Sequence, residues 1–358
     1  MEKGKKIFVA MSGGVDSSTT AALLKKKGYD ISGVFIKGWY PKSASWQIPC
    51  DWREDRRDAI KVAAKLNIPF YTFDFSKEYK KYIIDYMIKE YKAGRTPNPD
   101  IMCNKYIKFD LFLKKALEMG ADKIATGHYV KIKNNKLFEA KDLNKDQSYF
   151  LWTLTQAQLK YCLFPIGNYL KEEVRQMAKK FKLLVFDKKD SQGLCFVGKF
   201  KMEDFLKNYI KPKSGIILDQ NGKIVGKHKG VQYYTIGQRH GMGAHGQQPL
   251  YIIKKDLKKN VLIVAPESKQ KDFSKKEVLI KKVNWISSKR PSTKEKYLAR
   301  IRYRQSLQEA KLVIRNSKFI IQFKKPQKGV ASGQSLVLYK QTLRQAQGKE
   351  LLGGGIIC

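Results

Sequence analysis

Long apolar runs are missing from this 358-residue sequence. Its hydrophobic stretches fall far short of the ~20 residues needed to cross a bilayer. Charged residues near the start lead directly into a short predicted strand, which is not the pattern of a signal peptide. We therefore expect a cytoplasmic protein with no membrane partner.

Closely spaced cysteine pairs are absent as well. None of the five cysteines (Cys50, Cys103, Cys162, Cys195 and Cys358) forms the CxxC pair of a zinc ribbon or a thioredoxin-like motif. An odd number of cysteines in a cytoplasmic protein argues against a structural disulfide framework. Each thiol must therefore be judged by its surroundings, and those of Cys50, Cys162 and Cys358 indicate no chemistry.

Acidic residues are few compared with basic ones. The chain has 32 Asp and Glu against 72 Lys and Arg, a formal net charge of +40. Such a charge attracts polyanions, with nucleic acid as the first candidate. A lysine-rich proteome would give the same excess, because most of these residues are lysines spread along the chain. Composition alone leaves both explanations open.

Strand-like and helix-like stretches alternate in the first part of the chain. The predicted strands are Lys6–Ala10, Asp30–Lys37, Pro69–Asp74 and Lys123–Thr126, and the predicted helices are Ser17–Lys27, Arg53–Leu66, Tyr79–Tyr91 and Lys108–Met119. This alternation predicts an α/β fold with a doubly wound parallel sheet. Such sheets bind ligands at the carboxyl ends of their strands.

Short alternating strands separated by glycine-rich turns follow from about Gly215. They are predicted at Tyr251–Lys255, Val261–Ala265, Val278–Ile280, Leu298–Tyr303, Phe319–Phe323 and Leu336–Leu338. We expect a small β-rich central domain and a C-terminal β-barrel. The predicted domains span residues 1–205, 206–275 and 276–358.

The stretch SGGVDS, residues 12 to 17, follows the first predicted strand. It lacks the lysine of a Walker P-loop and the spacing of a dinucleotide fingerprint. Gly13 and Gly14 permit close approach of the backbone to a phosphate. Ser12 and Ser17 offer hydroxyl donors, while Asp16 would orient the loop or hold Mg²⁺. An ordinary tight turn is the alternative, although it would not need these polar residues.

Two further loops carry cysteines. In GRTPNPDIMCNKYIKF, residues 94 to 109, Pro97 and Pro99 stiffen a loop that precedes Cys103, and a helix is predicted to follow. A thiol near a helix N-terminus with Lys105 and Lys108 close by should ionise easily. In DSQGLCFVGKF, residues 190 to 200, Cys195 lies among glycines and lysines. An incidental cysteine is the alternative in each loop.

These motifs together resemble a known family. SGGVDS is similar to the loop of pyrophosphate-loop ATPases, which cleave ATP between its α- and β-phosphates. The motifs NPDIMCN, ATGHY, KDQSYFL, FPIG, DSQGLCF, YTIGQR, RYRQ, GQS and LLGGGII follow it between residues 98 and 357. In this order and nearly from end to end, the chain resembles the bacterial tRNA-specific 2-thiouridylase family. Only the segment after Tyr339 departs, as a longer predicted hairpin loop.

The resemblance implies ATP-dependent 2-thiolation of the wobble uridine of tRNA. ATP, with Mg²⁺ near Asp16, would adenylate the 2-carbonyl oxygen, and sulfur would then replace it. Cys195 would carry a persulfide delivered by a sulfur-relay protein or a cysteine desulfurase. Cys103, the nucleophile, would attack this persulfide to liberate sulfide, leaving a transient Cys103–Cys195 disulfide, or would help the persulfide to attack directly. Asp100 would act as acid, base or orienting group. An iron–sulfur cluster in place of the persulfide stays open.

The resemblance also implies two binding sets. The ATP-binding set is Ala10, Met11, Ser12, Gly13, Gly14, Val15, Asp16, Ser17, Ile36 and Gly127. The set for tRNA and its target base is Asn98, Pro99, Asp100, His128, Lys145, Asp146, Gln147, Arg302, Tyr303 and Gln334. Arg302 and Arg304 are expected on one face of a strand.

Two other classes of protein share some of these features. A pyrophosphate-loop ligase or amidotransferase acting on a small metabolite would need neither two cysteines nor a basic C-terminal module. A catalytically idle RNA-binding protein would be expected to carry a damaged loop, yet residues 12 to 17 are intact. Direct assays of AMP formation and of thiouridine separate the three.

Overall fold

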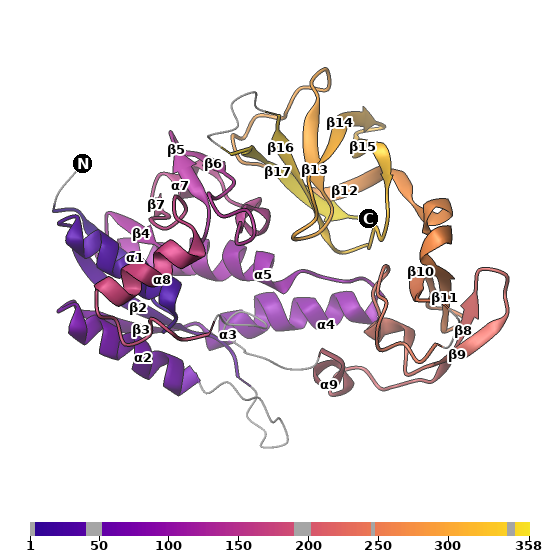
Figure 1. Cartoon of the computed structure of the whole chain (residues 1–358), viewed down its shortest axis with the longest axis horizontal. Helices are drawn as coiled ribbons and strands as arrows, with labels where there is room; N and C mark the ends of the chain where they lie inside the picture. Colours follow the sequence, from indigo (N-terminus) through magenta and orange to yellow (C-terminus); the bar gives the residue numbers. More distant parts are fainter. Residues whose placement is uncertain (1–3, 41–51, 190–201, 245–247, 342–347) are drawn as a thin grey trace.

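The computed structural model describes residues 4–40, 52–189, 202–244, 248–341 and 348–358. Figure 1 shows a parallel sheet with its helices, a C-terminal barrel, and a smaller set of central strands. Helices α4 (Asp85–Lys92) and α5 (Pro99–Met102) lie between the parallel sheet and the other two parts. Within the described residues, no helix combines the length and apolar character needed to span a bilayer.

Five parallel strands form the first sheet, in the order β3-β2-β1-β4-β7. They are β1 (Lys6–Ala10), β2 (Asp30–Lys37), β3 (Phe70–Asp74), β4 (Lys123–Ala125) and β7 (Cys162–Leu163). Strand order runs outward from β1 in both directions, so the predicted doubly wound sheet is confirmed. The two-residue strand β7 was not predicted.

Alternate side chains of the strands enter two separate apolar clusters, one on each face of the sheet. Ile7 and Val9 pack with α1 (Val15–Lys26), α2 (Trp52–Lys65) and α8 (Lys171–Lys180). Phe8 points to the other face, which is covered by the helical segments α3 (Ser76–Tyr79), η1 (Lys80–Ile84), α4, α5, η2 (Cys103–Leu111) and α6 (Phe112–Glu118).

The helix that carries Cys103 begins earlier than predicted. Instead of Lys108–Met119, helical structure runs without a break from Pro99 through η2 to Glu118. Asn98 caps it by accepting a hydrogen bond from the Ile101 backbone N–H at 3.3 Å. Pro99 occupies the first helical position, where a missing N–H has no cost. Cys103 therefore lies inside the helix and not in the loop before it.

A four-stranded sheet and a closed barrel make up the second half. The central sheet has the order β10-β11-β8-β9, with β8 (Gly215–Asp219), β9 (Ile224–His228), β10 (Leu250–Asp256) and β11 (Val261–Pro266). The six barrel strands are β12 (Lys275–Trp285), β13 (Tyr297–Arg300), β14 (Gln308–Arg315), β15 (Lys318–Gln327), β16 (Ser335–Lys340) and β17 (Glu350–Ile357). Pairing of β12 with both β15 and β17 closes the barrel.

One predicted barrel strand was too long. Strand β13 ends at Arg300, and the chain then turns, with Arg304 in the left-handed region at φ 62°. The prediction that Arg302 and Arg304 share a strand face is therefore wrong. The turn comes directly after Arg300, which is buried between the two carboxylates described below.

The barrel is joined to the first domain by a shared sheet and a shared core. A hairpin of β5 (Lys131–Lys133) and β6 (Lys136–Phe138) extends the barrel sheet, with Phe138 opposite Glu350 of β17. Trp152 belongs to the same apolar cluster as Val337 and Ile356 of the barrel. The barrel is thus fixed against the domain that carries the glycine corner. The remaining short helices are η3 (Ser148–Leu151), α7 (Gln156–Leu159), α9 (Met202–Lys207), η4 (Val231–Tyr233) and η5 (Glu267–Phe273).

Candidate active site

The glycine corner connects β1 to α1 and is tightly enclosed. Gly13 has φ 75°, and a Cβ there would lie 2.2 Å from the backbone oxygen of Asp55. A Cβ at Gly127, just after β4, would lie 2.7 Å from the backbone nitrogen of Ser17. Both positions therefore require glycine. The contact also brings the ends of β1 and β4 together at the switch in strand order, where such sheets bind ligands.

Hydroxyl groups line the start of α1. The Ser17 hydroxyl accepts a hydrogen bond from the Ser12 backbone N–H at 3.1 Å and lies 3.3 Å from the Ser12 hydroxyl. Gly14 occupies the N-cap position with an extended backbone and no side chain. The first N–H groups of α1 have no partners within the helix, so this end offers donors to an anion.

Asp16 is held by two residues from distant parts of the chain. Its Oδ1 accepts a hydrogen bond from the Tyr129 hydroxyl at 2.8 Å and lies 2.7 Å from Lys171 Nζ. Lys171 begins α8, which packs on α1, and its side chain is largely buried. The repulsion between Asp16 and a phosphate is therefore offset by a lysine within contact distance.

The strand β2 borders the same corner on its other side. The last residue of β1 to pair with it is Ala10, opposite Val34, and Met11 N–H then bonds to the Val34 carbonyl at 2.8 Å. Ile36 lies two residues farther along, beyond the end of β1. This position agrees with the expected approach of its backbone to an adenine, which stays a prediction.

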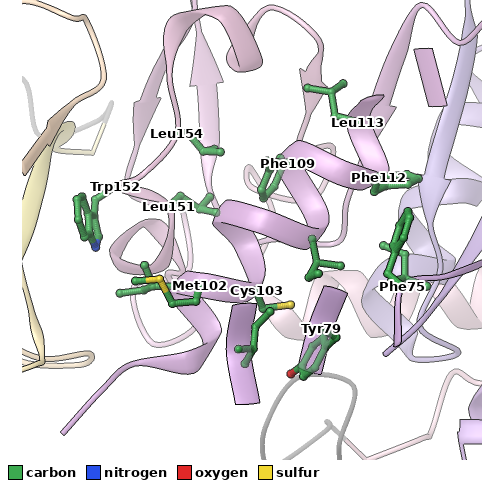
Figure 2. Packing of buried hydrophobic residues seen from close by; sticks show 14 of the residues in the cluster. Phe75, Tyr79, Met102, Cys103, Phe109, Phe112, Leu113, Leu151, Trp152 and Leu154 are labelled. Atoms are coloured by element: carbon green, nitrogen blue, oxygen red, sulfur yellow. The ribbon is translucent and has the colours of Figure 1, made fainter. Parts of the chain in front are cut away.

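Cys103 is fully buried among apolar side chains. Figure 2 shows its sulfur on the side of Tyr79, while the side chain of the preceding Met102 points the other way, toward Trp152. Asp100 lies in the first turn of the same helix. Cys195 and the rest of DSQGLCF lie outside the described residues, so the predicted pairing of the two thiols stays a prediction.

The loop before Cys103 is anchored by the barrel and by the central domain. The Gln334 side chain donates hydrogen bonds to the carbonyls of Thr96 and Pro97 at 3.1 and 3.3 Å. Thr96 N–H bonds to the Ser332 carbonyl at 2.8 Å, and its hydroxyl lies 3.1 Å from that of Thr235. Gln334 thus supports the loop that leads to Asn98 and Pro99, and its predicted contact with tRNA stays a prediction.

The predicted RNA-contacting residues of KDQSYFL face the protein. Asp146 is buried, and its carboxylate accepts hydrogen bonds from the Ala140 and Ser148 backbone N–H groups and from the Ser148 hydroxyl. Gln147 accepts from the Tyr129 backbone N–H at 2.9 Å, which positions the tyrosine that bonds to Asp16. Their contact with tRNA stays a prediction, as does that of the half-buried Lys145.

A buried ion triad lies beside them. Arg300 Nη2 is 2.6 Å from Glu139 Oε1 and 3.4 Å from Asp146 Oδ2. Burial raises the pKa of both carboxyl groups, and the arginine charge opposes that rise. The triad connects the first domain to β13 of the barrel.

His128 is also buried, in contact with aromatic rings. Its Nδ1 lies 2.7 Å from the Thr126 hydroxyl, and its ring packs against Phe109 and Phe164 at 5.7 and 6.2 Å. Burial, with the Lys108 charge in addition, lowers the pKa of His128 well below its usual range. The side chain is therefore neutral at physiological pH. Its predicted contact with the base stays a prediction.

The two remaining predicted RNA contacts lie at the turn after β13. Arg302 is exposed, and the Tyr303 ring packs on Phe150 with centroids 4.5 Å apart. The Arg304 guanidinium lies over the ring of the same tyrosine, 5.3 Å from its centroid. This turn therefore carries two exposed arginines, one of them over an aromatic ring, and the contacts of Arg302 and Tyr303 with tRNA stay predictions.

Comparison with known proteins decides the family. Three family models match in succession: a tRNA methyl transferase HUP domain over residues 5–199, a tRNA methyl transferase PRC-barrel domain over 203–266, and an aminomethyltransferase beta-barrel domain over 275–357. The tRNA-specific 2-thiouridylase of Buchnera aphidicola is 45% identical, over 100% of this chain and 98% of its own. The chain belongs to the tRNA-specific 2-thiouridylase family.

Other members of the tRNA-specific 2-thiouridylase family also match over nearly the whole chain. That of Karelsulcia muelleri is 43% identical over 99% of both chains. That of Geobacillus thermodenitrificans is 41% identical over 98% of this chain and 94% of its own. The three family models match residues 5–199, 203–266 and 275–357, and the domain boundaries at 205 and 275 stay predictions.

Sequence reasoning missed two residues that position the glycine corner. Lys171 and Tyr129 both contact Asp16, and neither lies near it in the sequence. Tyr129 directly follows the predicted His128, so the ATGHY motif was the available signal. Lys171 opens a helix in an ordinary lysine-rich stretch, and nothing local distinguishes it from other lysines.

Proposed function

We propose that this protein transfers sulfur to C2 of the wobble uridine in tRNA, at the expense of ATP. The observation that carries this proposal is the match of nearly the whole chain, at 41% to 45% identity, to proteins named tRNA-specific 2-thiouridylase. The enclosed glycine corner and the helix that carries Cys103 agree with it. The net charge of +40 suits a polyanionic substrate.

Adenylation is the first step of the proposed reaction. The uridine 2-carbonyl oxygen attacks the α-phosphorus of ATP, and pyrophosphate leaves. The oxygen on C2 is then esterified to AMP. AMP is a far better leaving group from C2 than oxide would be. Ser12, Ser17 and the N–H groups of α1 bind the phosphates, and Lys171 holds Asp16 in place beside them.

Sulfur transfer follows. The terminal sulfur of a persulfide on Cys195 attacks C2 and AMP leaves. The Cys103 thiolate then attacks the Cys195 sulfur, and the electrons of the broken S–S bond stay with the sulfur on C2. The products are 2-thiouridine, AMP and a Cys103–Cys195 disulfide, which a thiol reductant must reduce. A sulfur-relay protein or a cysteine desulfurase then reloads Cys195.

Magnesium is expected to bind together with ATP. Oδ1 of Asp16 already contacts Lys171 and Tyr129, so this carboxylate suits a single bond to an ion held mainly by phosphates and water. Among the described residues, no three His, Cys, Asp or Glu side chains group as metal ligands. For the sulfur we propose the persulfide route, with Cys195 as the carrier.

Incubation with ATP, Mg²⁺, a persulfide source and unmodified tRNA tests the proposal. Nucleoside mass analysis should detect 2-thiouridine, with AMP and pyrophosphate formed in equal amounts. Omission of ATP is the matched control and should leave uridine unchanged. AMP formation on a small metabolite, without thiouridine, would favour the alternative ligase.

A further inference from the structure

A pocket of about 170 Å³ lies between the helices of the first domain and the barrel. Lys81 of η1, Tyr86 of α4 and Lys105 of η2 form one side of it, with Trp152 and Thr153 after η3 behind them. Lys282 of β12 closes it from the barrel. No step of the proposed reaction uses this pocket.

Three residues that line this pocket each carry a buried polar atom without a hydrogen-bond partner among the described residues. These atoms are the Tyr86 hydroxyl, the Trp152 indole nitrogen and the Thr153 hydroxyl. Trp152 is 2% exposed and Thr153 8% exposed, so water hardly reaches them. A buried donor without a partner is costly, and three around one cavity indicate a ligand that accepts hydrogen bonds.

The charge of the pocket is positive. Within the described part of the chain, none of Lys81, Lys105 and Lys282 forms an ion pair with a carboxylate. The acidic neighbour Glu90 is paired with Arg95 at 2.5 Å. Burial, with the Glu90 charge in addition, raises the pKa of Tyr86 to about 12, so its hydroxyl keeps its proton at neutral pH. The ligand therefore meets three cations and neutral donors.

Aromatic rings hold two of these cations at the pocket. Tyr82 and Tyr106 stack with centroids 4.8 Å apart and planes 17° from parallel. Lys81 Nζ lies 5.4 Å from the Tyr82 centroid, and Lys105 Nζ lies 5.0 Å from that of Tyr106. Basic side chains together with aromatic rings are typical of surfaces that bind single-stranded nucleic acid.

We propose that this pocket binds a phosphate group of the RNA substrate, neutralised by the three lysines and hydrogen-bonded by Tyr86, Trp152 and Thr153. The assignment of this phosphate to RNA rests on the proposed function. Met102 lines the pocket, and Figure 2 shows that its side chain and the thiol of Cys103 point to opposite sides of their helix. A phosphate held here therefore fixes the RNA against the helix that carries Cys103.

Binding of unmodified tRNA, measured by fluorescence anisotropy at several salt concentrations, tests the proposal. Tyr86→Phe and Thr153→Val keep the side-chain shape and remove one donor, and each should weaken RNA binding about 3- to 10-fold. Lys105→Ala should also lower the slope of log affinity against log salt by roughly 0.7 to 0.9. Tyr91→Phe and Lys92→Ala, on the same helix α4 but outside the pocket, should change neither value.

The phosphate bound in the pocket could belong to the RNA backbone or be free in solution, and calorimetry with inorganic phosphate distinguishes the two. Loss of phosphate binding in Tyr86→Phe together with weaker tRNA binding supports the RNA backbone. Loss of phosphate binding with unchanged tRNA affinity supports the pocket as a site for a free phosphate. Unchanged affinity for both in all three variants overturns the proposal. If the wild-type protein forms no thiouridine but the pocket variants still bind tRNA more weakly, the proposed function is wrong and the pocket remains a site for an RNA phosphate.

Discussion

Lys171 Nζ lies 2.7 Å from Asp16 Oδ1, although 155 positions separate these residues in the sequence. The pair connects α8 to the first turn of α1, beside the N–H groups that face the glycine corner. An aspartate in that position repels a phosphate unless a positive charge balances it. Lys171 thus belongs to the machinery of the corner, even though the corner itself is a local sequence motif.

Replacing Lys171 by methionine should reduce tRNA-dependent pyrophosphate release about 10- to 100-fold. A charge-assisted hydrogen bond of this kind is worth roughly 1.5–3 kcal/mol, and Asp16 would lose its orientation. Lys141→Met is the matched control, because Lys141 pairs with Glu173 at 2.9 Å on the exposed side of α8. Equal release rates in both variants would show that the pair only stabilises the fold.

Gly127→Ala should separate β4 from the start of α1. The added methyl group would lie 2.7 Å from the Ser17 backbone nitrogen and 2.9 Å from the Asp16 carbonyl carbon. We expect a loss of about 1–3 kcal/mol of stability, seen as a lower urea midpoint, and weaker ATP binding. A Cβ at Gly14 would lie 3.6 Å from its nearest neighbour, the Ser12 hydroxyl, so Gly14→Ala should lower the midpoint less. An unchanged midpoint for Gly127→Ala would contradict the close contact.

Cys103→Ser and Cys195→Ser should each abolish thiouridine formation and leave tRNA binding nearly unchanged. In the proposed reaction one sulfur carries the persulfide and the other breaks its S–S bond, so neither replaces the other. Cys358→Ser is the control, since this thiol is exposed at the last residue. Wild-type thiouridine yield in either of the first two variants, measured by nucleoside mass analysis, would remove the two-thiol mechanism.

The glycine corner could be predicted because its signals are local. A strand, two glycines and a polar helix start follow one another within Lys6–Ser17, and the predicted bounds of β1 and β2 are confirmed. The contact of Lys171 with Asp16 could not be predicted, because Lys171 approaches it only through the packing of α8 on α1. Packing between distant segments of the first domain decided this contact, and sequence periodicity carries no information about such packing.

The end of strand β13 in the barrel shows the opposite case, in which a local sequence pattern gave a wrong prediction. Alternation of Arg302, Tyr303 and Arg304 predicted a strand, but Arg300 is drawn inward by Glu139 and Asp146 and the chain turns directly after it. The same long-range packing attaches the β5–β6 hairpin to β17. The end of β13 thus coincides with an ion triad that involves two carboxylates of the first domain, and a local sequence pattern does not reveal such a contact.

The buried triad predicts a stability that depends on pH. Burial raises the folded-state pKa of Glu139 and Asp146 above the unfolded values, so the folded chain binds these protons more tightly. The resulting contribution to stability is fully present below the unfolded pKa, near 4, and is lost as the pH rises through the folded pKa values. Arg300 limits this loss by neutralising the carboxylates at 2.6 and 3.4 Å.

Arg300→Met should therefore destabilise the protein much more at pH 8 than at pH 5. At pH 8 two buried carboxylates would lack a counter-charge, at a cost of about 3–5 kcal/mol. At pH 5 protonation relieves part of that cost, and urea midpoints at the two pH values measure the difference. Arg315→Met, which breaks an exposed pair with Glu277, should change the midpoint little at either pH. An equal loss at both pH values for Arg300→Met would mean that the guanidinium acts through its packing on Tyr339, 4.8 Å from the ring centroid, and not through its charge.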